Sequence, residues 1–258
     1  MAQANQLAIV QINNASALVK TGNFRGAEAA LQEIASAEGD KALTKALTMV
    51  PPADLSQILV GTATQPSAIC SGLVTPETFV KALLEVPNTW EPGYEEEALL
   101  QLQELFCGVV MRPDGEGYAG YHATKFFKEI YKNQEATELL AFYLNDKVVV
   151  ASASSKPKKV AVLETTDGED EDDDNEDGNN NDVEVPDDED EVERKTLAFH
   201  PCLTDKDYEP QEGDWDHLAS LTRKVPDLLG SLKMLWINGI VYESFLPSVT
   251  KKARKSAL

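Results

Sequence analysis

The sequence predicts a mainly α-helical protein in which an array of short helices is followed by a small mixed α/β segment. Three observations support this fold class. Apolar residues recur at helical spacing up to about residue 146, β-branched runs follow, and residues 164–193 hold eighteen Asp and Glu without one Lys or Arg. We therefore expect a helical domain at residues 1–146 and an α/β segment at residues 147–163 and 194–250. A disordered acidic insert at residues 164–193 and a basic tail at residues 251–258 complete the predicted organisation.

The first 38 residues predict two helices joined by a tight turn. Apolar residues between Leu7 and Val19 lie close to helical spacing, and Thr21-Gly22-Asn23 interrupts the pattern. A second apolar run with spacings of three and four follows, and Gly39 ends it as a C-terminal cap: Phe24, Ala27, Leu31 and Ile34.

Seven residues of this hairpin carry a resemblance to a known repeat: Ala15, Leu18, Gly22, Phe24, Ala27, Leu31 and Ile34. Over residues 8–38 they resemble the central part of a tetratricopeptide repeat. In that family the glycine permits the turn between the helices, and a small residue at the position of Ala27 lets the two helices approach. No second copy follows at the 34-residue period of the family, and its Trp and terminal Pro are absent. A plain αα-hairpin is the alternative interpretation.

Prolines predict the starts of several further helices. Pro51-Pro52, Pro66 and Pro76 each precede a short apolar run, and Thr75 is placed to cap the helix that begins at Pro76. Two more helices are expected farther along the chain, at residues 94–106 and 122–144.

The pattern changes after residue 146. The runs at residues 147–151 and 159–163 predict β-strands, and residues 195–199 predict a third strand beyond the acidic insert. Asp214 is expected to cap a helix through Trp215 and Leu221. Asn238-Gly239, between apolar runs, predicts a β-hairpin.

The acidic insert supplies −18 of the net charge of −21. Within it, Asp173, Asn175, Asp177, Gly178 and Glu184 match the spacing of an EF-hand calcium loop, in which alternating oxygen ligands surround the ion. Weak Ca²⁺ or Mg²⁺ binding is one interpretation of this spacing. A chance match within an acidic tract is the other, because no amphipathic helices are expected to flank it.

The sequence offers little support for catalysis. Gly115, Gly117 and Gly120 match G-x-G-x-x-G, but Glu116 would meet the pyrophosphate, and the surroundings are helical rather than βαβ. The three histidines and three cysteines form no recognised catalytic or zinc-binding spacing. We therefore expect no enzyme activity, no cofactor and no catalytic residue.

The expected location is cytoplasmic, because the sequence shows neither a signal peptide nor a membrane span. A nuclear location is the alternative, because Lys251-Lys252-Ala253-Arg254-Lys255 fits a nuclear-localisation pattern. The basic cluster could also fold back onto the acidic insert.

The predicted function is that of a non-catalytic scaffold or adaptor that binds another protein, with neither nucleic acid nor membrane as a direct partner. Aromatic residues near the expected helix ends are the candidate contact residues: Phe24, Trp90, Tyr94 and Tyr118. The first alternative is an acidic chaperone or nucleic-acid mimic that binds basic partners through residues 164–193. The second is a nucleotide-using enzyme that employs the Gly115–Gly120 loop.

Overall fold

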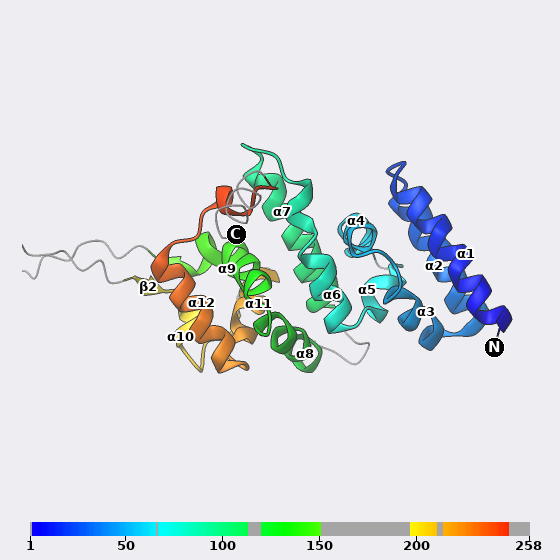
Figure 1. Cartoon of the computed structure of the whole chain (residues 1–258). Coiled ribbons are helices and arrows are strands. Elements are labelled where there is room, and N and C mark those ends of the chain that lie inside the picture. The colour runs from blue at the N-terminus through cyan, green and yellow to red at the C-terminus, as the bar shows by residue number, and fades with distance from the viewer. Residues whose placement is uncertain (1, 66, 113–119, 151–196, 211–213, 248–258) are drawn as a thin grey trace, which may run out of the picture. The chain divides into compact units, whose positions relative to one another are not determined.

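The computed structural model describes residues 2–65, 67–112, 120–150, 197–210 and 214–247 (Figure 1). These residues are mainly helical, with twelve α-helices and only two short strands among them. Contacts between residues group 1–150 with 199–258 in one compact unit and place 151–198 in another. Every described helix belongs to the first unit.

The first part of the chain folds into seven α-helices and two shorter helical turns. Their bounds are α1 (Ala2–Val19), α2 (Phe24–Glu38), α3 (Asp40–Leu47), α4 (Pro52–Thr62), α5 (Ile69–Leu73), α6 (Pro76–Leu83), the 3₁₀-helix η1 (Val86–Thr89), α7 (Glu95–Leu105) and the π-helical turn η2 (Phe106–Val110).

The second part contains five α-helices, both strands and a 3₁₀-helix. Their bounds are α8 (Gly120–Tyr131), α9 (Gln134–Val148), β1 (Val149–Val150), β2 (Ala198–Phe199), α10 (Pro201–Thr204), α11 (Asp214–Thr222), α12 (Pro226–Asn238) and η3 (Tyr242–Phe245).

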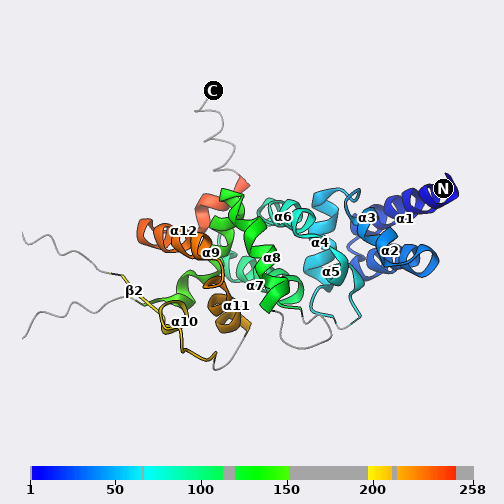
Figure 2. The same ribbon diagram turned by 90° about the horizontal axis from the view of Figure 1, so that it is seen from below.

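The predicted N-terminal hairpin is present, and α1 and α2 lie side by side in both ribbon views (Figures 1 and 2). Gly22 turns the chain with φ of 74°, a conformation that side chains with a Cβ rarely adopt. Asn23 then caps α2, because its side-chain oxygen accepts a hydrogen bond from the Gly26 amide at 2.9 Å. The tetratricopeptide resemblance of this hairpin remains a prediction.

Two of the three proline-marked helix starts are confirmed. Pro52 and Pro76 occupy the first positions of α4 and α6, where a missing N–H costs no helical hydrogen bond. Thr75 caps α6 as predicted, and its hydroxyl oxygen accepts a hydrogen bond from the Thr78 amide at 3.3 Å. Pro66 lies outside the described residues.

The prediction of one helix over residues 122–144 is wrong, because the chain forms two helices here. Asn133 separates α8 from α9 with an extended backbone, φ −120° and ψ 118°. Its side-chain oxygen accepts a hydrogen bond from the Ala136 amide at 3.0 Å, which caps the new helix. The apolar pattern continues across the break because α8 and α9 both contribute to one core.

The predicted β-hairpin at Asn238-Gly239 is also wrong. Asn238 is the last residue of α12, and Gly239 caps the helix with φ of 81°. Leu228, Leu232 and Trp236 recur every four residues and are all buried, so the helical period decides the structure of this segment. A glycine after an asparagine serves a helix end as well as a hairpin turn.

The strands are shorter than predicted. Of residues 147–151, only Val149 and Val150 are extended, since α9 continues through Val148. They form a two-stranded sheet with β2. The run at residues 159–163 lies outside the described residues. The helix predicted to begin at Asp214 is confirmed as α11.

The C-terminal helices pack on the earlier ones. The α12 helix lies against α9, and the indole Nε1 of Trp236 donates a hydrogen bond to the Ala141 carbonyl at 2.8 Å (Figures 1 and 2). Beyond it, the hydroxyl of Tyr242 donates to the Glu91 carbonyl at 2.6 Å. Among the described residues, no helix is both long enough and apolar enough to cross a membrane.

Candidate partner-binding groove

Two adjoining hollows form a groove along α7, named here the α7 groove. The first, of about 250 Å³, is lined by Thr89, Trp90, Glu91, Tyr94, Glu97, Ala98 and Gln101. The second, of about 340 Å³, is lined by Phe24, Ser56, Gln57, Val60, Gly61, Val86, Thr89, Gln101 and Glu104. Thr89 and Gln101 line both hollows, so the two hollows meet at these residues.

Gln101 occupies the junction of the two hollows with a fixed orientation. Its Oε1 atom accepts hydrogen bonds from the Trp90 indole Nε1 at 3.0 Å and from the Thr89 hydroxyl at 3.4 Å. Within the described part of the chain, its amide nitrogen has no hydrogen-bond partner. The groove therefore offers a donor to an approaching carbonyl at its centre.

An aromatic cluster supports one wall of the groove. The Trp90 ring is 6% exposed and packs against three aromatic rings at centroid distances of 5.7–6.0 Å: Phe142, Tyr242 and Phe245. The indole is therefore held from behind by residues of α9 and η3. This packing holds the indole in one position at the wall of the hollow.

Phe24 shapes the opposite end of the groove. Its ring lies directly on Gly61 of α4, where an added Cβ would stand 2.7 Å from the ring carbon Cδ2. Only a glycine permits this approach, which brings the start of α2 onto α4. Phe24 stays half-buried, so part of its ring faces the groove.

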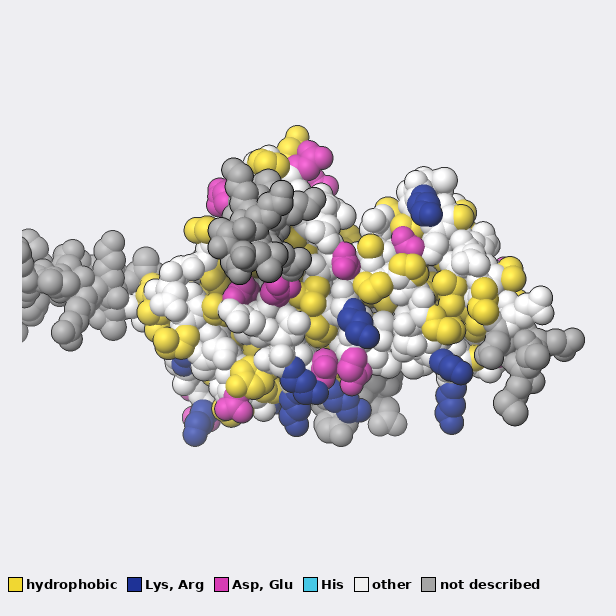
Figure 3. Space-filling model, viewed as in Figure 1, with side chains coloured by type: hydrophobic (Ala, Val, Ile, Leu, Met, Phe, Trp, Pro, Cys, Tyr) yellow, Lys and Arg dark blue, Asp and Glu magenta, His cyan; other side chains and the backbone are white. Residues whose placement is uncertain are grey.

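Among the described residues, all the charged side chains that line the groove are acidic: Glu91, Glu97 and Glu104. Glu95 and Glu96 extend this charge over the first turn of α7, and Figure 3 shows Asp and Glu side chains at that upper edge of the molecule. Burial raises the pKa of Glu104 above its usual range. No salt bridge offsets that partial burial within the described residues.

The groove brings together three of the four aromatic residues predicted from the sequence. Tyr94 is 57% exposed at its rim, Phe24 is half-buried at one end, and Trp90 presents one edge of a buried ring. Tyr118 lies outside the described residues, as do the predicted metal ligands Asp173, Asn175, Asp177 and Glu184.

Comparisons with known proteins do not identify a relative of this chain. No protein-family model, curated protein or solved structure matches the chain. The assignment of the groove therefore depends on its own geometry and charge.

Sequence reasoning missed the two polar residues that give the groove its chemistry. Gln101 and Glu104 fall among the ordinary polar positions of an amphipathic helix, and no spacing links Gln101 to Trp90, eleven residues earlier. It also missed a buried cluster of His200, Cys202 and Asp216. The closeness of His200 and Cys202 in the sequence was the one available signal for that cluster.

Proposed function

We propose that the protein is a non-catalytic interaction module that binds a segment of another protein in the α7 groove. The observation that carries this proposal is that the two hollows meet at Thr89 and Gln101, which puts a buried indole, an exposed tyrosine and an oriented amide donor side by side. Aromatic anchors with a few oriented polar groups are the usual composition of a protein–protein contact surface.

The charge of the groove indicates the chemistry of the partner. Glu91, Glu97 and Glu104 line it, and no Lys or Arg of the described residues does. Glu104 is the most informative of the three, because its half-buried carboxylate lacks an ion-pair partner among the described residues. A lysine or arginine from a partner would supply the missing countercharge. We therefore propose a basic segment that also carries an apolar anchor residue.

A peptide-display selection against the intact chain tests this function. We expect the enriched peptides to combine Lys or Arg with an aromatic or aliphatic residue. Tyr94→Ala should raise their Kd about tenfold or more, the loss typical of truncating an aromatic anchor. Glu104→Gln should weaken binding in the same assay by removing the countercharge.

Tyr131→Ala provides the matched control. Tyr131 is 43% exposed on α8 and lines a different, wider hollow between α8 and α12, so its removal should leave binding unchanged. Acidic or uncharged enriched peptides would contradict the proposed partner chemistry. Equal affinities for the wild type and for the Tyr94 and Glu104 variants would exclude the groove as the binding site.

A further inference from the structure

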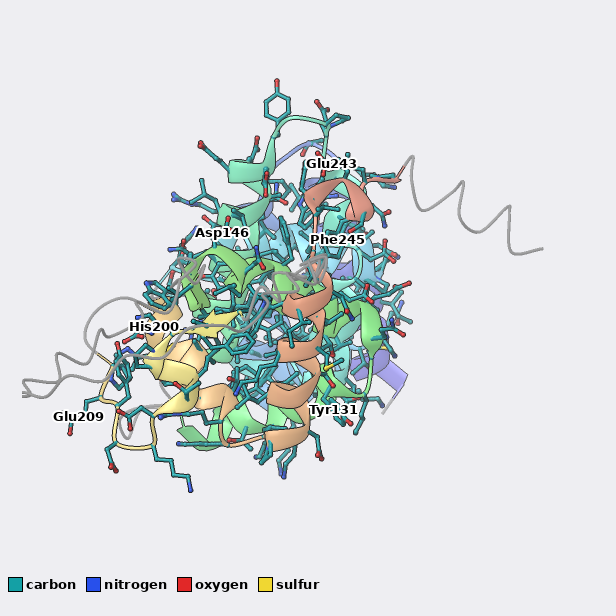
Figure 4. The ribbon with its side chains drawn as sticks, turned by 90° about the vertical axis from the view of Figure 1, so that its left-hand side faces the viewer. Tyr131, Asp146, His200, Glu209, Glu243 and Phe245 are labelled. Carbon is teal, nitrogen blue, oxygen red and sulfur yellow. The ribbon has the colours of Figure 1, made fainter. Side chains whose placement is uncertain are left out.

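A second site lies apart from the groove, where the first turn of α10 meets α11. His200 and Cys202 come from a short H-x-C stretch, and Asp216 comes from α11. One ligand atom from each side chain, a ring nitrogen, a sulfur and a carboxylate oxygen, lies within 4.8 Å of the other two. Figure 4 shows His200 well separated from Glu243 and Phe245, which mark the end of the molecule near the groove.

We propose that His200, Cys202 and Asp216 bind a Zn²⁺ ion. Thiolate, imidazole and carboxylate are the three side-chain ligands of zinc in proteins, and the mixture of one soft and two harder donors favours zinc over Mg²⁺ or Ca²⁺. Ligand atoms around a tetrahedral zinc stand about 3.5 Å apart. Small side-chain rotations that move the ligand atoms by about 1 Å therefore complete the site. Three protein ligands leave the fourth position to water.

The surroundings of the cluster hold its ligands in place. Cys202 is fully buried and Asp216 is 1% exposed. The Tyr208 hydroxyl lies 3.3 Å from both carboxylate oxygens of Asp216, and the His200 ring packs edge-on against the rings of Tyr208 and Trp215. Partners that orient the ligands in this way are a regular feature of metal sites.

The His200 backbone and ring are also fixed. Its amide donates to the Val148 carbonyl at 2.8 Å, and its Nδ1 atom accepts the Cys202 amide at 3.2 Å. Nδ1 therefore bonds the backbone, and Nε2 is the ring nitrogen left to bind a metal ion.

A nucleophilic cysteine is the competing interpretation of the cluster, and the geometry argues against it. The Nδ1 atom of His200 already accepts a hydrogen bond from the Cys202 amide, so that nitrogen is not free to act as a base toward the sulfur. Complete burial also denies a substrate access to it. A metal ion needs neither a paired base nor repeated access to the site, since it is taken up once and displaces the thiol proton.

Cobalt substitution of the intact chain tests the proposal. After the chain is stripped of metal with a chelator, we expect it to bind one Co²⁺ through sulfur, with a thiolate-to-cobalt charge-transfer band and the visible bands of tetrahedral Co²⁺. Zn²⁺ should displace the cobalt and abolish both. The acidic insert offers only oxygen ligands, so cobalt bound there gives no sulfur band.

Variants then assign the sulfur. Cys202→Ser should remove the charge-transfer band, whereas Cys70→Ser and Cys107→Ser, the matched controls, should retain it. Tyr208→Phe keeps all three ligands and should weaken Zn²⁺ binding about 10–100-fold. If Cys202→Ser does not fold, the wild-type spectrum and the two control variants still decide the question. Absence of a sulfur band in the wild type, or its persistence in Cys202→Ser, would overturn the proposal.

Discussion

Replacing Gly108 by alanine tests the packing that sets the two walls of the α7 groove. Gly108 lies in η2, which continues the helix that carries Gln101 and Glu104, and it meets Ala63 directly after α4. An added Cβ would stand 2.6 Å from the Ala63 Cβ, 2.7 Å from its carbonyl carbon and 2.8 Å from its carbonyl oxygen. Carbon atoms in contact normally lie about 3.5–4.0 Å apart, so the overlap is about 1 Å.

No rotamer change relieves this overlap, because two of the three contacted atoms belong to the backbone. The α4 helix and η2 must therefore separate. Overpacking of this kind typically costs about 1–3 kcal/mol, which exceeds the gain of about 0.5–1 kcal/mol that alanine brings over glycine in a helix. We expect Gly108→Ala to lower the free energy of unfolding and to weaken binding of the selected basic peptides.

Urea denaturation monitored by tryptophan fluorescence measures this effect. Gly230→Ala is the matched control, because Gly230 lies within α12 and an added Cβ there meets no atom within 4 Å. The control should be more stable than the wild type by about 0.5–1 kcal/mol. The packing argument fails if both substitutions stabilise the protein, or if Gly108→Ala unfolds at the wild-type urea concentration with wild-type peptide affinity.

Three side chains, Glu104, Trp236 and Asn133, carry the remaining predictions. Because burial raises the pKa of Glu104, acidification should reduce binding of basic peptides at a higher pH than an ordinary glutamate would allow, and Glu104→Gln should remove that step in a pH series of Kd. The same raised pKa means that ionised Glu104 destabilises the free fold. As the pH falls through that pKa, the unfolding free energy of the wild type should therefore rise relative to that of Glu104→Gln. Trp236→Phe should cost about 0.5–1.5 kcal/mol in a urea titration, because the buried hydrogen bond from the indole to the Ala141 carbonyl of α9 is lost. Asn133→Ala should cost about 0.5–2 kcal/mol in the same assay through loss of the α9 cap, whereas the exposed Asn88→Ala, outside any cap, should change little.

Local signals in the sequence were enough to predict most helices of the first part. Gly22, Asn23, Pro52 and Thr75 act through their own backbone conformations or through hydrogen bonds within three residues. Such signals need no knowledge of the tertiary structure. They failed at Asn133 and Gly239, where one residue type serves two kinds of structure. There the choice depends on which face of the segment meets the core, which local patterns do not specify.

The groove was predictable only in part. Aromatics near the expected helix ends pointed to Phe24, Trp90 and Tyr94, but nothing in the sequence shows that the two hollows meet at Gln101. The same holds for the His200 cluster, whose third member, Asp216, lies 14 residues beyond Cys202 across a turn. Both sites depend on the packing of helices that are distant in sequence.

One wall of the α7 groove depends on η3, near the end of the described chain. Trp90 belongs to the first part of the chain, yet its ring packs against three rings of the second part: Phe142, Tyr242 and Phe245. The Tyr242 hydroxyl also donates a hydrogen bond to the Glu91 carbonyl at 2.6 Å. Burial and the neighbouring carboxylates, Glu95 foremost among them, raise the pKa of Tyr242, so this hydroxyl keeps its proton for the bond. The η3 segment therefore fixes both the indole and the acidic turn beside it. Loss of the η3 contacts would therefore free the residues that form this wall of the groove.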